Sequence, residues 1–206
     1  MEFFGDAVIL CGGKSKRMGF DKAFLKINGK YILETIAEKL SLCFGSVRLC
    51  ADSADSAEKL KVFGLELIID LKNEGIGPAV GIYTALSQAQ TAFVFVTACD
   101  MPLLDVAHIG AMKRALAEHA FLHDALIPMN GAYIEPLYSF YAAGLAGHFA
   151  EEIGEGNYKI HNILKKCNTL YFPDPSSRVF DKDLRMFTNI NNTNDLEWIS
   201  WILPSS

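Results

Sequence analysis

The chain has 206 residues, of which half are hydrophobic and 21% are charged, a globular composition that excludes a disordered protein. Its formal net charge of -5 argues against a nucleic-acid surface, which usually has a basic excess. Five cysteines, an odd number without CxxC spacing, favour reduced thiols in a cytosol over a disulfide framework or a zinc ribbon. We therefore expect a cytoplasmic protein with a single domain spanning residues 1–206.

Apolar runs and helical spacings alternate through the first half of the chain. Four runs predict strands, at Ala7–Leu10, Val47–Ala51, Leu65–Ile69 and Phe93–Cys99. Helices are expected at 32–40 and, after Gly77-Pro78, at 78–89. This alternation predicts an α/β fold with a doubly wound, mainly parallel sheet.

The segment from Ile76 to Cys99 contains no charged residue and is long enough to span a bilayer. However, polar residues including Thr84, Gln88 and Gln90 lie near its middle, where a bilayer tolerates them least. We interpret the segment as a buried helix, a short turn and a central strand, and we expect no membrane association.

The second half begins with a predicted helix that Asp105 caps. Asn130-Gly131 then separates two apolar runs, a typical hairpin signal. We therefore expect at least one antiparallel strand around Glu135–Tyr141. Residues 142–186 show no clear pattern, and a last helix is expected from Asn192 or Thr193 through Ile202.

The strongest local signal is Leu10–Lys26, with the sequence LCGGKSKRMGFDKAFLK. Glycines directly after a buried strand let the backbone approach a ligand, and free N–H groups there form an anion cradle. Four cations follow within nine residues: Lys14, Lys16, Arg17 and Lys22. The segment matches neither Walker A nor GxGxxG. It predicts a triphosphate-binding loop of another kind, and the alternative is a basic surface turn.

Three acids follow predicted strands, at the edge where ligands of such sheets bind: Asp52, Asp70 and Asp100. Asp100 follows the most apolar strand and is a candidate ligand for Mg²⁺, which prefers one or two carboxylates plus substrate phosphates. The alternative for Asp100 is a helix cap, since Pro102 follows. Asp70 is a second candidate by the same topology, and its alternative is a solvated loop acid.

Asparagines gather before the last helix, at positions Asn189, Asn191, Asn192 and Asn194. Amides can donate to and accept from a heterocycle or a phosphate, although turns and caps also favour asparagine. The histidines show no metal-ligand spacing. Cys99, beside Asp100, is interpreted as a small buried residue and not as a nucleophile.

Taken together, these segments resemble the molybdenum cofactor guanylyltransferases of the MobA type. LCGGKSKRMGFDKAFLKINGK resembles that family's signature LAGGxSxRMGxDKxxLxxxGxxL. Further matches follow in order along almost the whole chain: Gly64-Leu65 through Asp70, Gly77-Pro78-Ala79-Val80-Gly81, Asp100-Met101-Pro102, Glu135-Pro136-Leu137-Tyr138 and Phe187-Thr188-Asn189-Ile190-Asn191. This chain departs from the pattern at Cys11, Cys50 and Asn192-Thr193, and in Gly131–Ile134, where a basic residue common in the family is missing.

The resemblance implies a three-layer, Rossmann-like nucleotidyltransferase fold, and transfer of GMP from GTP to the terminal phosphate of molybdopterin with release of pyrophosphate. It implies Arg17, Lys22 and Asp100 as catalytic residues, and Mg²⁺ on Asp100. It implies GTP binding by the segment Leu10, Cys11, Gly12 and Gly13, and by Lys22, Asp70 and Asp100. Asn189 and Asn191 are expected on the pterin side, and transient contact with molybdopterin-delivering and molybdoenzyme chaperone proteins is also expected.

Two alternatives stay open. One is a related nucleotidyltransferase that uses CTP, acting on molybdopterin or on a sugar or polyol phosphate, because a fold does not fix a function. Asp21-Lys22-Ala23 and the Gly12-Gly13 doublet favour the guanylyl branch. The other is a nucleotide-binding protein that delivers the cofactor without turnover.

Overall fold

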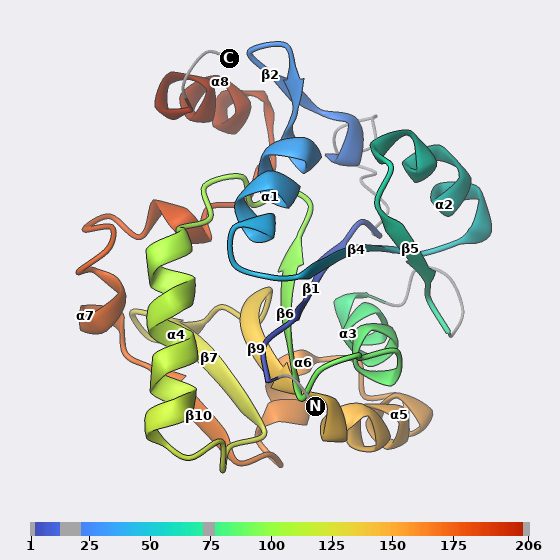
Figure 1. Cartoon of the computed structure of the whole chain (residues 1–206), viewed down its shortest axis with the longest axis vertical. Coiled ribbons are helices and arrows are strands. Elements are labelled where there is room, and N and C mark those ends of the chain that lie inside the picture. Colours follow the sequence, from blue (N-terminus) through green and yellow to red (C-terminus); the bar gives the residue numbers. More distant parts are fainter. Residues whose placement is uncertain (1–2, 13–21, 72–76, 204–206) are drawn as a thin grey trace.

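The computed structural model describes residues 3–12, 22–71 and 77–203. A central sheet has the strand order β10-β7-β9-β6-β1-β4-β5, and β8 pairs with β7 (Figure 1). Its strands are β1 (Asp6–Leu10), β4 (Ser46–Ala51), β5 (Glu66–Ile69), β6 (Phe93–Ala98), β7 (Ala125–Asn130), β8 (Tyr133–Ile134), β9 (Tyr138–Ala142) and β10 (Thr169–Phe172). A separate hairpin pairs β2 (Lys26–Ile27) with β3 (Lys30–Tyr31).

The sheet is mainly parallel. β1 pairs in parallel with β4 and β6, β5 is parallel to β4, and β10 is parallel to β7. β9 lies antiparallel between β6 and β7, so it runs against the other strands of the path. The expectation of an antiparallel strand around Glu135–Tyr141 is therefore confirmed.

Helices cover both faces of this sheet. The helices of the described part of the chain are α1 (Ile32–Ser41), α2 (Ala54–Leu60), α3 (Pro78–Ser87), α4 (Val106–Glu118), α5 (Ala146–Gly154), α6 (Ile160–Leu164), α7 (Asp174–Ser177) and α8 (Thr193–Ile202).

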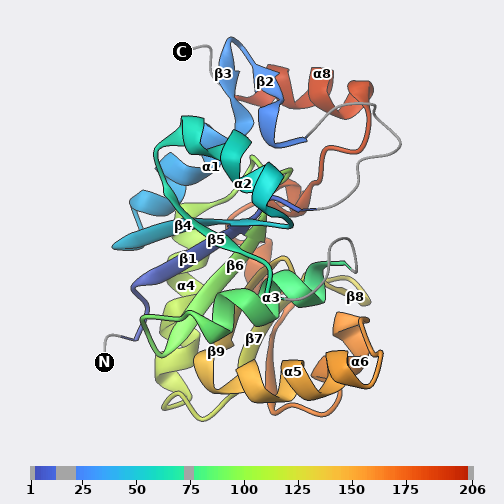
Figure 2. The same cartoon turned by 90° about the vertical axis from the view of Figure 1, so that its right-hand side faces the viewer.

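Alternate residues of β1 face opposite layers, because side chains of a strand alternate between its faces. Ala7 and Ile9 join the core beneath α1 and α4, whereas Val8 and Leu10 join the core against α3, α5 and α6. Figure 2 shows the sheet between these two helical layers, which confirms the three-layer α/β expectation.

Several local predictions are also confirmed. The uncharged stretch that could have spanned a bilayer forms α3 and β6, and no helix in the described ranges is long and apolar enough to cross a membrane. Asn130-Gly131 turns the chain between β7 and β8, with Gly131 at a φ of 62°. The side chain of Asp105 caps α4, and Asn192 caps α8.

The C-terminal helix α8 packs beside the β2–β3 hairpin (Figure 1). The Asn28 side-chain amide at its turn donates to the carbonyls of Ser200 (3.3 Å) and Leu203 (3.2 Å), near the end of α8. The hairpin follows Lys22 in sequence, and α8 follows the asparagine cluster. The contact therefore holds these two candidate site segments on the same side of the molecule.

His108, in the first turn of α4, is fully buried among aromatic rings. Its Nε2 lies 3.0 Å from the Ser177 hydroxyl, whereas its Nδ1 has no hydrogen-bond partner among the described residues. Four rings contact its imidazole edge-on: Tyr138, Phe172, Phe180 and Phe187. Burial lowers the pKa of His108 from 6.5 to about 4, and the nearby charge of Asp105 opposes this shift.

We predict that His108 makes stability depend on pH. In the unfolded chain His108 has a pKa of 6.5, whereas in the folded protein its pKa is about 4. Between these pH values the unfolded chain therefore binds a proton that the folded protein does not. The free energy of unfolding falls as the pH is lowered through this range. The comparison is urea unfolding of the wild type and His108→Gln at about pH 7.5 and about pH 4.5. The stability of the wild type relative to the variant should fall by roughly 2.5 kcal/mol between these pH values. If the difference in unfolding free energy between the wild type and His108→Gln is the same at both pH values, the prediction is wrong.

Candidate functional site at the carboxyl edge of the sheet

Four neighbouring parallel strands end in a row at one edge of the sheet, on the right in Figure 2. Asp70 follows β5, Asp52 follows β4, Cys11 and Gly12 follow β1, and Asp100 lies just beyond β6. Backbone hydrogen bonds extend the strand pairing into these positions, from Cys11 to Cys50 (2.8 Å) and from Cys99 to Leu10 (3.1 Å). The sheet therefore fixes the backbone from which the candidate residues project.

Lys22 and Asp100 meet at this edge. The Lys22 ammonium donates to Asp100 Oδ2 at 2.7 Å, and the two side chains are 20% and 15% exposed. The two residues are 78 positions apart in sequence. The arrangement brings a cation from the glycine-rich segment against the acid that follows β6, as the topology predicts.

The helix-cap interpretation of Asp100 is not supported by its contacts. The N-cap of the next helix, α4, is Asp105, whose carboxylate accepts from the backbone N–H of His108 at 2.8 Å. Asp100 instead bonds Lys22 through Oδ2, and no hydrogen bond to its Oδ1 is present within the described part of the chain. The Asp100 side chain is thus engaged with Lys22 and not with the start of α4.

The asparagine cluster joins the same site through its middle residues. Asn191 Oδ1 accepts from the Lys22 ammonium at 3.4 Å, and the backbone N–H of Ile190 donates to the carbonyl of Asp100 at 2.9 Å. Asn189 is linked through its carbonyl, which accepts from the Asn191 side chain at 3.4 Å. Asn192 instead caps α8, so the cap interpretation holds for that member of the cluster.

Gly12 is required by close approach of its backbone to Asp52. A Cβ at this position would lie 2.8 Å from the Cβ of Asp52, closer than real Cβ contacts. The Asp52 carboxylate accepts from the hydroxyls of Ser56 (2.6 Å) and Ser53 (3.3 Å). The sequence marks Asp52 as a strand-end acid but gives it no role, because its proximity to Gly12 depends on the pairing of β1 with β4.

Asp70 is held from two sides. The Cys50 thiol donates to Asp70 Oδ1 at 3.1 Å, and the Thr84 hydroxyl, which accepts from the Leu71 N–H at 3.1 Å, also favours the charged carboxylate. Burial raises the pKa of Asp70, and Cys50 and Thr84 oppose that effect. Burial and the Asp70 charge raise the pKa of the Cys50 thiol far above its usual range, so this thiol is not a nucleophile.

Asp100 meets the chemical requirement for a magnesium ligand. Magnesium needs hard oxygen ligands and is commonly held by one or two carboxylates together with substrate phosphates. No group of three or more His, Cys, Asp or Glu residues suited to a metal occurs among the residues described. A nucleotide bound at this edge would bring phosphate oxygens as further ligands. The candidates Gly13 and Arg17, with Lys14 and Lys16, lie outside the described residues.

Comparisons with known proteins agree with this architecture. The model of the MobA-like NTP transferase domain matches residues 7–170. A probable molybdenum cofactor guanylyltransferase of Peptoclostridium acidaminophilum is 33% identical over 204 residues, covering 98% of this chain and 90% of the relative. The molybdenum cofactor guanylyltransferase of Syntrophotalea carbinolica is 32% identical, covering 94% and 90%.

A solved structure is similar along its whole length. The crystal structure of molybdopterin-guanine dinucleotide biosynthesis protein A from Archaeoglobus fulgidus superposes with a TM-score of 0.84 at 33% identity, covering 96% of this chain and 97% of that one. The shared fold is the Rossmann-like, three-layer fold of nucleotidyltransferases. The chain therefore belongs to the family of MobA-like NTP transferases, and it is a nucleotidyltransferase.

Proposed function

We propose that this protein transfers GMP from GTP to the terminal phosphate of molybdopterin, forming the guanine dinucleotide form of the molybdenum cofactor and releasing pyrophosphate. Relatives matched over most of this chain are named molybdenum cofactor guanylyltransferases, which supports a guanylyl donor and a molybdenum cofactor as acceptor. The observation that carries the proposal is the pair of Lys22 and Asp100, which places a cation and a potential metal ligand together at the carboxyl edge between β1 and β6.

The site suits a reaction whose nucleophile is already ionised. A phosphate oxygen of the acceptor needs no general base, so the protein has to align two anions and offset their charge. The residues that meet around Asp100 supply these functions, namely an ammonium from Lys22 and an amide from Asn191. This set contains no Ser–His–Asp arrangement, and the reaction does not require one.

We assign roles from the family resemblance and, for the described residues, from their order along the edge. The backbone from Leu10 through Gly13, with Arg17 and Lys22, binds the triphosphate. Asp70, on the β5 side, holds the nucleoside. Asn189 and Asn191 lie beside Asp100, and we assign them to the acceptor.

Magnesium bound to Asp100 would withdraw charge from the α-phosphate and from the pyrophosphate leaving group. Asp100 is well suited to hold it because its carboxylate is anchored at the end of a buried strand. Lys22 donates to the same carboxylate, so Asp100 also holds the ammonium ready for a phosphate oxygen.

We further propose a single working domain over residues 1–206, because the central sheet includes strands from both halves of the chain. All five cysteines are free thiols in the structure, which supports a reducing, cytoplasmic location. We also propose that partner proteins deliver molybdopterin and remove the product.

The test is pyrophosphate release from GTP, CTP and ATP, each with and without molybdopterin and Mg²⁺. Release should require GTP, molybdopterin and the metal together. Consumption of CTP but not GTP would reassign the protein to cytidylyl transfer. Tight GTP binding with no pyrophosphate release under any condition would identify a non-catalytic binding protein.

A further inference from the structure

The carboxyl edge of the sheet continues past Asp100 into a second polar group. Asn130 ends β7, and Glu135 lies shortly before β9. The Asn130 side-chain amide donates to Glu135 Oε1 at 3.0 Å. Neither residue belongs to the set that meets around Lys22 and Asp100.

Hairpin geometry places a tyrosine on the same face as this pair. Asn130 is the direct partner of Tyr133 in the β7–β8 pairing, so their side chains share a face. Glu135 follows Tyr133 by two residues and continues that face. Tyr133 is 79% exposed, so its ring is open to a ligand.

The backbone of this hairpin is firmly held. The Glu135 N–H donates to the Pro128 carbonyl at 2.9 Å, and the Glu135 carbonyl accepts from the Ser139 hydroxyl at 2.6 Å. At the turn, the Gly131 N–H donates to Asp174 at 2.8 Å. Glu135 and Tyr133 therefore project from a fixed frame.

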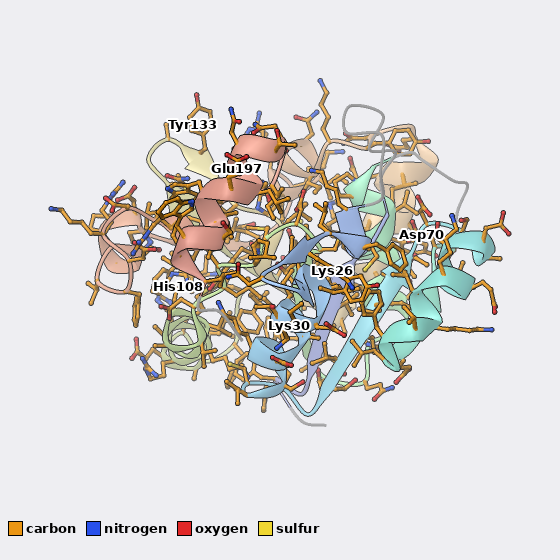
Figure 3. All side chains as sticks on the ribbon, turned by 90° about the horizontal axis from the view of Figure 1, so that it is seen from above. Lys26, Lys30, Asp70, His108, Tyr133 and Glu197 are labelled. Atoms are coloured by element: carbon orange, nitrogen blue, oxygen red, sulfur yellow. The ribbon has the colours of Figure 1, made fainter. Side chains whose placement is uncertain are left out.

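Strand register places Asn130 and Glu135 beyond Asp100 along the edge, on the side away from Asp70, which we assign to the nucleoside. Tyr138 pairs with Thr97, near the end of β6, so Glu135 lies beyond that end of the sheet. Asp70 follows β5, at the opposite end of the strand order. Figure 3 shows Tyr133 and Asp70 widely separated on this side of the molecule. A ligand at Glu135 would therefore belong to the acceptor and not to GTP.

The chemistry of the pair fits a flat ring that presents N–H groups. Oε1 accepts from Asn130, and Oε2 has no hydrogen-bond partner within the described ranges. Burial raises the pKa of Glu135, while the Asn130 bond lowers it, so the carboxyl is partly desolvated. A half-buried carboxylate gains most from donors that reach it directly. The 2-amino-4-oxo edge of a pterin carries two adjacent donors, the 2-amino group and N3–H.

We propose that Glu135, oriented by Asn130, binds the N–H edge of the pterin ring of the acceptor while Tyr133 covers the face of that ring. The inference rests on the proposed function and deepens it by identifying how the acceptor is recognised. It also accounts for the absence of a basic residue in Gly131–Ile134, because this hairpin contacts the ring and leaves the phosphate to the residues around Asp100.

The first test measures guanylyl transfer by Glu135→Gln. The amide has nearly the same shape but loses the charge and offers only one acceptor. We expect the KM for molybdopterin to rise about tenfold or more, while kcat and the KM for GTP stay within about threefold. Glu151→Gln, at an exposed site on α5, is the matched control and should leave every parameter unchanged.

The second test uses binding without turnover. Pterin fluorescence should report binding of 6-hydroxymethylpterin to the wild type, and 6-hydroxymethyllumazine, which lacks the 2-amino group, should bind at least about fivefold more weakly. Glu135→Gln should lose this preference. Tyr133→Ala, at an exposed position that should not affect folding, should weaken pterin binding, and Tyr133→Phe should restore it.

These experiments separate the two proposals. If the wild type releases no pyrophosphate, the proposed function fails, but pterin binding still tests Glu135. A lower melting temperature for Glu135→Gln with an unchanged KM for molybdopterin and unchanged pterin preference would show that the carboxylate only stabilises the hairpin. An equal rise in the KM for GTP would show that Glu135 acts on the nucleotide. Either result would overturn the inference.

Discussion

Asp100→Asn is expected to lower guanylyl transfer by orders of magnitude while leaving the protein folded. Asp100 lies two residues beyond β6, a strand whose first five residues are buried, and its Oδ2 accepts from Lys22 at 2.7 Å. Asparagine keeps the shape and one oxygen, so it can still accept from Lys22. What it removes is the negative charge that a magnesium ion requires from the protein.

The electrostatic requirement makes this effect large. A bound triphosphate brings about four negative charges, and the described cation that contacts Asp100 is Lys22 alone. Without a ligated divalent ion, the α-phosphate and the acceptor phosphate would meet with much of their charge unscreened. A contribution of several kcal/mol to the transition state corresponds to a rate loss of a thousandfold or more.

The measurement is guanylyl transfer by Asp100→Asn over a range of Mg²⁺ and Mn²⁺ concentrations. Loss of a direct ligand should show partial recovery at high metal, because weaker binding can be offset by concentration. Because Asp105 caps α4, the melting temperature should change little. Activity within about threefold of the wild type at low Mg²⁺ would exclude a metal role for Asp100.

Lys22→Ala is expected to remove most of the stabilisation by GTP without altering the fold. The ammonium contacts Asp100 and Asn191, both at the ligand edge, and its side chain is 20% exposed. A charge-assisted bond to phosphate contributes about 1.5–3 kcal/mol, which corresponds to roughly a 10- to 150-fold weaker Kd for GTP.

Thermal melting with and without GTP measures this effect. The two apo proteins should melt at similar temperatures, whereas the GTP-induced rise should be largely lost in the variant. Lys59→Ala, at an exposed site on α2, serves as the control and should retain the full rise. An equal rise for Lys22→Ala would identify Lys22 as an ordinary surface charge.

The sequence predicts most of the sheet because its strands are buried on both faces. An apolar run such as Phe93–Cys99, with acidic or turn residues at its end, is typical of a central parallel strand, and the structure confirms it as β6. Residues 142–186 lack this signal because they form short elements. In α5, for example, only Phe149, Glu152 and Ile153 are buried, and Gly147 and Gly154 interrupt the helical pattern. Helix α2 buries just Ala57 and Leu60, too few to show a stripe.

The sequence predicts those contacts of the candidate site that follow from the order of the strands in the sheet. Lys22 and Asp100 follow neighbouring strands, so their meeting can be inferred from the alternation of strands and helices. The bond between Asn130 and Glu135 could not be inferred in this way, because it depends on the exact register of the β7–β8 hairpin. The contact of Gly12 with Asp52 likewise becomes visible only when β1 and β4 are paired.

The central claim is that a guanylyl group moves from GTP to molybdopterin. Incubation with molybdopterin, Mg²⁺ and GTP labelled at either the α- or the γ-phosphate tests it most directly. The label from the α-phosphate should appear in a dinucleotide product, and the γ-label should appear in pyrophosphate. Recovery of the α-label in free GMP or GDP, or in unchanged GTP, would contradict the account.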